Sequence, residues 1–151
     1  MSQAEPGDRL RENVEIVLAL YDTFNRRDEE ALVALYDPEV EILSFAAAVE
    51  GSPVFEGHAG VRAWFRNLVG TLSMVIEAGG LLPYRRYVLT IPQIHIRAGD
   101  GLATTYEQGI IYEIRNGLIL RSLGYKDAAT AFIKLGQLLR GSNPEAAGLR
   151  E

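Results

Sequence analysis

The chain has no cysteine among its 151 residues and only two histidines, His58 and His95. The missing sulfur excludes disulfide bridges, thiol nucleophiles and cysteine zinc sites, and two histidines are too few for a histidine zinc cluster. The glycines form neither GxGxxG nor GxxxxGK[S/T], and GxSxG is absent, so nucleotide cofactors and a serine elbow have no support. We therefore predict a protein that uses no metal and no other cofactor.

Positive charge and long hydrophobic runs are also scarce. Against 20 acidic residues stand 15 lysines and arginines, which gives a net charge of −5. This balance disfavours nonspecific binding to nucleic acid or anionic membranes, because both attract positive charge. No apolar run approaches the roughly 18 residues of a membrane span, and residues 1–8 show no secretion signal. We expect a cytoplasmic protein with no nucleic-acid and no membrane partner.

The composition that is present is that of an average globular domain, with 48% hydrophobic and 23% charged residues. The length suits one domain with a core of its own. No internal repeat and no linker divides the chain. We predict a flexible N-terminus at 1–12, a single domain at 13–140 and a flexible C-terminal tail at 141–151.

Helical patterns dominate the first half of the chain. One set of apolar residues recurs at the spacing of a single helical face and predicts a largely buried first helix: Val14, Val17, Leu18, Tyr21 and Phe24. Asp28 is a favourable N-cap for a second helix, which Asp37-Pro38 is expected to end. A third helix begins near His58 and carries Trp64 on its apolar face.

The second half reads as antiparallel strands. Strands are expected at 40–45, 88–97, 102–115 and 118–125. A tight turn at 98–101 and the hairpin dipeptide Asn116-Gly117 join the last three of them. Asp127 caps a short final helix. Helices followed by antiparallel strands indicate an α+β fold in which a curved sheet folds over the helices.

Six segments occur in an order and spacing typical of one known family. They lie at 17–32, 35–41, 50–51, 55–62, 112–119 and 124–127, and include Tyr21-Asp22-Thr23-Phe24-Asn25 and Phe55-Glu56-Gly57-His58. In these segments the chain resembles the SnoaL-like branch of the nuclear-transport-factor-like superfamily. The resemblance implies a cone-shaped α+β barrel, with a strongly curved, mostly antiparallel sheet wrapped around three N-terminal helices, and a short C-terminal helix. It also implies an apolar pocket between sheet and helices, and a homodimer.

Members of this family include both enzymes and noncatalytic binding proteins, so the pocket residues must distinguish them. Steroid-isomerase-like members use a tyrosine on the first helix, an aspartate at the end of the first strand and an acid on a later strand. The resemblance places these positions at Tyr21, Ser44 and Ile110. It therefore implies that the tyrosine is kept and both acids are missing.

The other enzyme types of the family lack their acids here as well. The arginine and two aspartates of epoxide-hydrolase-like members correspond to Ile91, Gln93 and Gly124. The acid of polyketide-cyclase-like members falls at Ser122 or Gly124. The resemblance thus implies a pocket without the standard acid and base carboxylates.

Strand periodicity predicts which side chains reach the pocket. Alternation along 102–115 turns one set inward: Leu102, Thr104, Tyr106, Gln108, Ile110, Tyr112 and Ile114. If the hairpin turns at Gly99-Asp100, His95 lies opposite Thr104 and Gln93 opposite Tyr106, each pair on one face. The preceding strand disagrees, because Val88, Ile94 and Ile96 are more apolar than their odd-numbered neighbours. Either both faces of the sheet are covered, or Pro92 marks a bulge.

Two residues are candidates for catalysis. His95 can act as base and acid near neutral pH, because an unperturbed histidine has a pKa of about 6.5. Tyr21 could donate a hydrogen bond to a developing oxyanion, as its counterpart does in the isomerases that the chain resembles. The structural alternatives are a hydrogen-bonded sheet histidine and a core tyrosine with a local partner. Further residues are expected to contact a ligand: Gln93, Tyr106, Gln108, Ser44, Ile91 and Trp64.

Three functions follow from this pattern. The first is binding of an oxygen-bearing hydrophobic organic molecule in an apolar pocket. The second is cofactor-free isomerisation, dehydration or ring closure, with His95 as the base and Tyr21 as the oxyanion donor. The third is a noncatalytic module for dimerisation or partner docking. A pocket bordered by these two residues would support the first two, whereas a cavity filled by its own side chains would favour the third.

Overall fold

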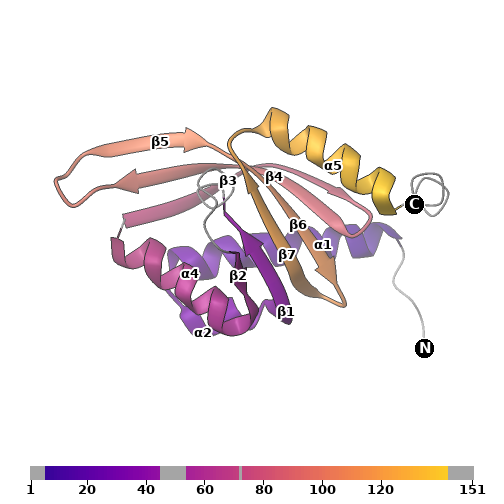
Figure 1. Ribbon diagram of the computed structural model, residues 1–151, viewed down its shortest axis with the longest axis horizontal. Coiled ribbons are helices and arrows are strands. Elements are labelled where there is room, and N and C mark those ends of the chain that lie inside the picture. The colour runs from indigo at the N-terminus through magenta and orange to yellow at the C-terminus, as the bar shows by residue number, and fades with distance from the viewer. Residues whose placement is uncertain (1–5, 45–53, 72, 143–151) are drawn as a thin grey trace.

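The structure, a computed structural model, describes residues 6–44, 54–71 and 73–142. A curved sheet forms its middle layer, with one helix on one face and the remaining helices on the other (Figure 1). The helices are α1 (Pro6–Asn25), α2 (Glu29–Val33), α4 (Gly57–Thr71) and α5 (Ala128–Ser142). Three N-terminal helices and one C-terminal helix agree with the sequence, although α5 continues beyond the predicted short helix.

Seven strands make up the sheet. They are β1 (Tyr36–Leu43), β2 (Phe55–Glu56), β3 (Ser73–Tyr84), β4 (Tyr87–Arg97), β5 (Ala103–Glu107), β6 (Gly109–Arg115) and β7 (Leu118–Tyr125). Their order is β2-β1-β7-β6-β4-β3, and β5 pairs with the second half of β4. The β1–β7 pair is parallel and the other pairs are antiparallel. The predicted α+β class with a mostly antiparallel sheet is confirmed.

Helix boundaries differ from the prediction at two places. Helix α1 begins at Pro6, so residues 6–12, predicted to be flexible, form its first turns. Proline is well tolerated at a helix start because its missing N–H needs no partner there. Helix α2 is capped as expected by Asp28, whose carboxylate accepts from the Ala31 N–H at 3.2 Å, but it ends at Val33. Tyr36 already pairs with Ile119 of β7, and this pairing draws the chain out of the helix.

The pairing of β4 with β5 differs by one residue from the prediction. His95 lies opposite Thr105 and Gln93 opposite Glu107. The cause is the turn, which has three residues instead of two: the Ala98 N–H donates to the Leu102 carbonyl at 2.8 Å. Gly101 supplies the left-handed residue (φ +89°) that a three-residue hairpin loop requires. Because strand side chains alternate, this shift reverses the face on which each β4 side chain lies.

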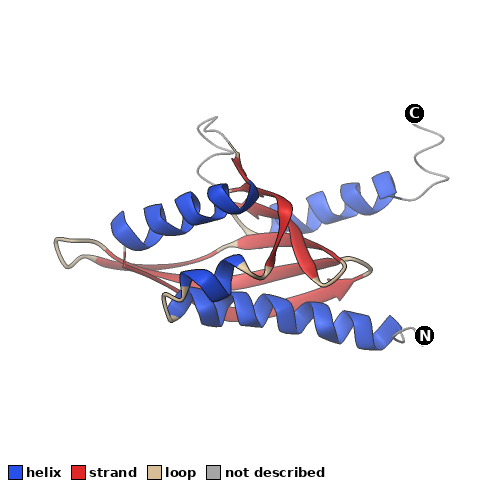
Figure 2. Ribbon diagram, turned by 90° about the horizontal axis from the view of Figure 1, so that it is seen from below, coloured by secondary structure: helices blue, strands red, loops and turns tan. Residues whose placement is uncertain are grey.

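Each face of the sheet has its own core. The inner face, which we define as the face toward α1, α2 and α4, packs the larger cluster. Helix α1 packs against β3, and α4 packs against β1. In Figure 2, α1 is the long helix that begins at the N label and lies beside the strands. The outer face, toward α5, holds a smaller cluster: Tyr87, Leu89, Ile111, Ala131 and Leu135. The first alternative for β4, that both faces are covered, is therefore correct for 87–91, where the cover comes from α5 of the same chain. A bulge also lies beside Pro92, but it belongs to β3, whose register shifts between Glu77 and Gly80.

Candidate functional site

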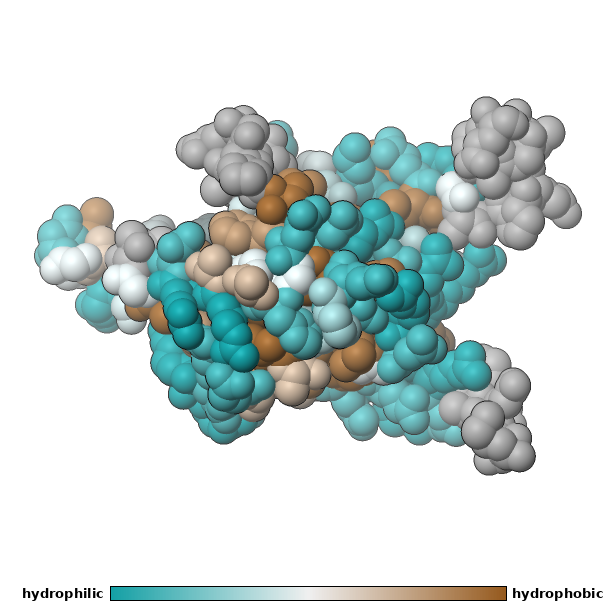
Figure 3. Space-filling view, turned by 60° about the horizontal axis from the view of Figure 1, so that its bottom comes forward, coloured by the Kyte–Doolittle hydropathy of each residue, from teal (hydrophilic) through white to brown (hydrophobic). Residues whose placement is uncertain are grey.

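A cavity of about 300 Å³ lies between the inner face of the sheet and helices α1 and α4. Most of its wall is apolar: Leu20, Phe24, Ile42, Leu43, Phe55, Trp64, Leu68, Met74, Ile76, Ile94, Ile96, Ile110 and Gly124. The surrounding helical side of the molecule is largely hydrophilic, with smaller hydrophobic areas between (Figure 3). This volume and this lining are typical of a site for a small organic molecule.

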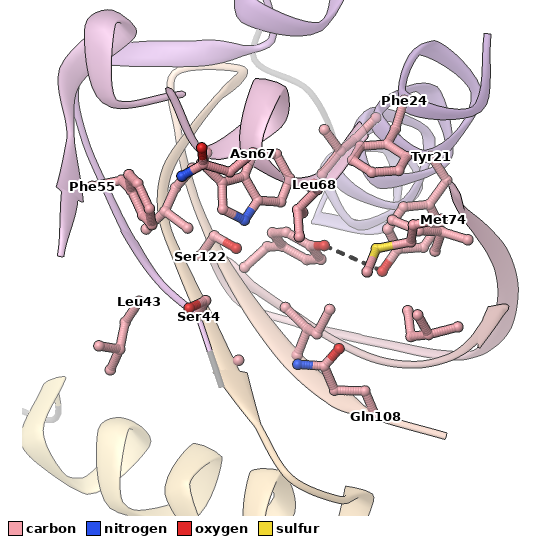
Figure 4. A pocket seen from close by; sticks show the side chains of 18 of the residues that line it. Tyr21, Phe24, Leu43, Ser44, Phe55, Asn67, Leu68, Met74, Gln108 and Ser122 are labelled. Carbon is pink, nitrogen blue, oxygen red and sulfur yellow. Dashed lines mark hydrogen bonds between the residues drawn. The ribbon is translucent and has the colours of Figure 1, made fainter. Parts of the chain in front are cut away.

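Four polar side chains from different elements join the apolar wall. Ser44 follows β1, Asn67 lies on α4, Gln108 lies between β5 and β6, and Ser122 lies on β7. Figure 4 shows Asn67 and Ser122 on one side of the cavity and Gln108 on another. Within the described chain, the side chains of Asn67, Gln108 and Ser122 form no hydrogen bond, so each can serve a ligand.

A chain of buried hydroxyls stands at the end of the cavity where Tyr21, Phe24 and Met74 lie (Figure 4). The Tyr112 hydroxyl lies 3.3 Å from the Tyr21 hydroxyl, which lies 2.8 Å from Oγ1 of Thr90. Burial raises the pKa of Tyr21 to about 12, against a smaller lowering by its hydrogen bonds. Burial also raises the pKa of Tyr112 well above its usual value. Both phenols therefore keep their protons at neutral pH.

A third tyrosine belongs to the same neighbourhood. Tyr36 is fully buried, and burial, with a smaller contribution from Tyr21, raises its pKa. Among the described residues, its hydroxyl has no hydrogen-bond partner. A buried unpaired hydroxyl costs stability, since it has lost water without gaining a substitute.

Five residues predicted from the sequence to border the pocket do line the cavity: Tyr21, Tyr106, Gln108, Ser44 and Trp64. The inward set predicted for the long strand is also correct from Tyr106 to Tyr112. Four residues that the resemblance assigns to acid positions of the related enzymes also line the cavity: Ser44, Ile110, Ser122 and Gly124. Gln93, which the resemblance assigns to a further aspartate position, does not line it. That the acids of those enzymes are replaced in this cavity stays a prediction.

The placement of His95, Gln93 and Ile91 in the cavity was wrong. His95 lies on the outer face, where its ring nitrogens contact the Thr105 hydroxyl and the Glu77 carboxylate, each at 2.8 Å. Gln93 donates to the Glu107 carboxylate at 3.0 Å on that same face. Ile91 packs against the α5 cluster. The three-residue turn explains all of these placements, because it makes Ile94 and Ile96 the inward residues of β4.

Several cavity residues had not been predicted. Asn67 follows Trp64 by three positions on α4, a spacing that places the two on one helical face and could have identified it. Met74 and Ile76 are alternate residues of β3, and both line the cavity. Thr90, which lies behind the cavity wall, was not predicted either, because its partners Tyr21 and Ile110 are distant in sequence.

A family model described as a SnoaL-like domain matches residues 17–122. The chain belongs to the SnoaL-like family. The resemblance seen in the sequence is therefore confirmed, and the match spans every strand from β1 to β6 as well as most of β7. A comparison with curated proteins finds no match.

Solved structures share the fold of this SnoaL-like protein. TerC, co-crystallised with polyporic acid, is 23% identical, with a TM-score of 0.69 over 82% of this chain and 97% of that one. Rv0760c from Mycobacterium tuberculosis, in complex with estradiol-17β-hemisuccinate, is 17% identical, with a TM-score of 0.67 over 76% and 92%. SalBIII, an epoxide hydrolase/cyclase-like enzyme in pyran ring formation in the polyether salinomycin, is 19% identical, with a TM-score of 0.67 over 76% and 90%.

None of the helices described is long and apolar enough to cross a membrane. The residues that the structure describes contain no group of three or more histidine, aspartate or glutamate side chains that could hold a metal ion.

Proposed function

We propose that this SnoaL-like protein binds a small, oxygen-bearing hydrophobic organic molecule in the cavity between α1, α4 and the inner face of the sheet. The observation that carries the proposal is the cavity itself, an apolar space of about 300 Å³ with isolated polar groups in its wall. Apolar walls favour a hydrophobic ligand through burial, and a few fixed polar groups orient it.

The chemistry of the cavity wall supports a ligand with hydrogen-bonding oxygens. Asn67, Gln108 and Ser122 offer amide and hydroxyl groups from separate elements, and Tyr21 and Tyr112 offer hydroxyls at another end. The structural relatives TerC and Rv0760c were solved with polyporic acid and with an estradiol ester, both of which carry oxygens on a carbon-rich frame. Molecules of this class are the first to test.

The two other functions derived from the sequence have less support. The proposed base, His95, lies on the outer face, so it is not placed to act on a ligand in this cavity. A docking module would need no open space between sheet and helices, whereas a cavity is present. The homodimer and the cytoplasmic location stay predictions.

The proposal is tested by ligand-dependent stabilisation of the whole chain. Estradiol, polyporic acid and related steroids and aromatic polyketides are titrated while thermal unfolding is followed. A specific ligand raises the free energy of unfolding by about 2.7 kcal/mol at a concentration one hundred times its Kd. Chemical-shift changes in the NMR spectrum then identify the residues in contact. Failure of the whole panel to stabilise the protein would contradict the proposal.

A pair of variants locates the site. Ser122 is buried in the cavity wall, so Ser122→Leu places a larger side chain in the space of the ligand. We expect this variant to fold and to lose ligand-induced stabilisation. His95→Gln changes the outer face and is expected to keep the parental affinity, which calorimetry measures. An affinity that falls with His95→Gln but is unchanged by Ser122→Leu would place the ligand on the outer face of the sheet and contradict the proposed site.

A further inference from the structure

The hydroxyl chain beside the cavity continues to a backbone carbonyl. Oγ1 of Thr90 lies 3.4 Å from the Ile110 carbonyl oxygen, in addition to its 2.8 Å contact with the Tyr21 hydroxyl. Thr90 is completely buried, and it is not among the described residues that line the cavity, whereas Tyr21 and Tyr112 are. The chain therefore has one end at the cavity and the other behind it.

The direction of the hydrogen bonds follows from counting protons. Each hydroxyl has one proton to donate, and a carbonyl can only accept. If Thr90 donates to the Ile110 carbonyl, Tyr21 must donate to Thr90, and Tyr112 must donate to Tyr21. All three protons are then used within the chain of hydroxyls, and none is free for a ligand. What remains for a ligand is an acceptor, the lone pair of the Tyr112 oxygen.

We infer that this end of the cavity selects a ligand hydroxyl over a ligand carbonyl, and that Thr90 sets this preference from behind the wall. The inference rests on the proposed ligand-binding function. A ligand hydroxyl can donate to Tyr112 with the chain unchanged. A ligand carbonyl needs a proton from Tyr21 or Tyr112, and freeing one breaks a hydrogen bond in the chain. Such a loss corresponds to about a five- to tenfold weaker Kd.

Thr90 is a positioning residue, and two substitutions separate its hydroxyl from its shape. Thr90→Val keeps the branched side chain and removes the acceptor of the Tyr21 proton, so Tyr21 can donate into the cavity. Thr90→Ser keeps the hydroxyl and should behave like the parent. A purely structural role would change the affinity for both ligand types together and leave their ratio unchanged.

The probes are 2-tetralol and 2-tetralone, which share one carbon frame and differ in a hydroxyl against a carbonyl. Their Kd values are measured by NMR titration for the parent, Thr90→Val and Thr90→Ser. We expect the alcohol to bind the parent about five- to tenfold more tightly than the ketone, by the loss of one hydrogen bond. Thr90→Val should bring this ratio down to about one, because the penalty for the ketone is removed, and Thr90→Ser should keep the parental ratio.

The outcomes separate the inference from the function on which it rests. Binding of both probes with a parental ratio of one or below, or with the same ratio in Thr90→Val, overturns the inference and leaves the binding function standing. The parental ratio decides even if Thr90→Val does not fold. Binding of neither probe, together with failure of the ligand panel, overturns the function and the inference with it.

Discussion

At the scale of single residues, three neighbouring tyrosines differ in the surroundings of their hydroxyls: Tyr21, Tyr36 and Tyr112. Tyr21 and Tyr112 share a hydrogen bond of 3.3 Å, whereas the Tyr36 hydroxyl is buried without a partner among the described residues. Burial is the main cause of the raised pKa values of Tyr36 and Tyr112. Charge repulsion from Tyr21 adds to it at both residues, and repulsion from Tyr36 adds to it at Tyr112. The cost of burying an oxygen is therefore offset by hydrogen bonding at two of the three positions.

The first prediction concerns this difference. Tyr36→Phe removes an unpaired hydroxyl, so we expect the free energy of unfolding to stay equal or to rise by about 1 kcal/mol. Tyr112→Phe removes a paired hydroxyl and should lower it by about 1 kcal/mol. Urea unfolding of both variants measures the two values. A clear loss of stability in Tyr36→Phe would show that its hydroxyl has a partner in solution.

At the scale of elements, the position of α5 depends on a close contact between the start of this helix and Gly109. Gly109 begins β6, and a Cβ atom there would lie 2.5 Å from the Asp127 carbonyl oxygen and 2.6 Å from Cβ of Ala131. Neither backbone nor a helix side chain can give way easily at such distances. The absence of a side chain at Gly109 thus allows α5 to cover the outer core.

The second prediction tests this approach. Gly109→Ala should force α5 away from the sheet and lower the free energy of unfolding by about 1–3 kcal/mol, the usual cost of overpacking. Gly99→Ala is the matched control, since a Cβ at Gly99 meets nothing within 4 Å. Its stability should remain within about 0.5 kcal/mol of the parent. Chemical denaturation compares the two, and equal stabilities would show that α5 adjusts freely.

At the scale of the whole molecule, stability should depend on pH through a buried carboxylate. Glu113 accepts from Arg86 at 2.8 Å and from Arg121 at 2.6 Å. Burial raises the pKa of Glu113, but the two arginines outweigh burial and lower the pKa overall. Because its folded pKa lies below the unfolded one, Glu113 stabilises the fold above the unfolded pKa, and this contribution is lost as pH falls through the folded pKa.

The third prediction follows from this sign. At pH 7, Glu113→Gln should be less stable than the parent by about 2 kcal/mol, because charged hydrogen bonds to both arginines are lost. The difference should shrink as the pH is lowered below about 4. Glu15→Gln, an exposed change on α1, serves as the control. Unfolding measured from pH 3 to pH 8 gives both curves, and a difference that does not vary with pH would contradict the argument.

The fourth prediction concerns assembly. The resemblance to SnoaL-like proteins predicts a homodimer of this 16.6 kDa chain. Sedimentation equilibrium at micromolar concentration should then give about twice the chain mass, with dissociation on dilution following mass action. A mass equal to one chain at every concentration would reject the homodimer.

Much of the fold could be predicted because it depends on local patterns. The Asp28 cap, the Asn116-Gly117 turn and the buried stripe of Val17, Tyr21 and Phe24 on α1 each follow from neighbouring residues, and each is found in the structure. Leu18, predicted to lie on the same stripe, is 40% exposed. The end of α2 and the length of α5 could not be predicted in this way. Tyr36 leaves the helix to pair with Ile119, and α5 is stabilised by packing on the outer face, so partners distant in sequence decide both.

The candidate site, like the fold, could be predicted from the sequence only where local patterns decide it. The sequence by itself determined the family, the inward set from Tyr106 to Tyr112, and five residues of the cavity wall, because alternation and family spacing are carried by the chain order. Only the tertiary structure decided the face of β4 and the role of Thr90. One extra residue in the 98–102 turn moves His95 to the outer face, since a one-residue slip reverses every side chain of a strand. The hydroxyl chain exists only because α1, β4 and β6 meet in space.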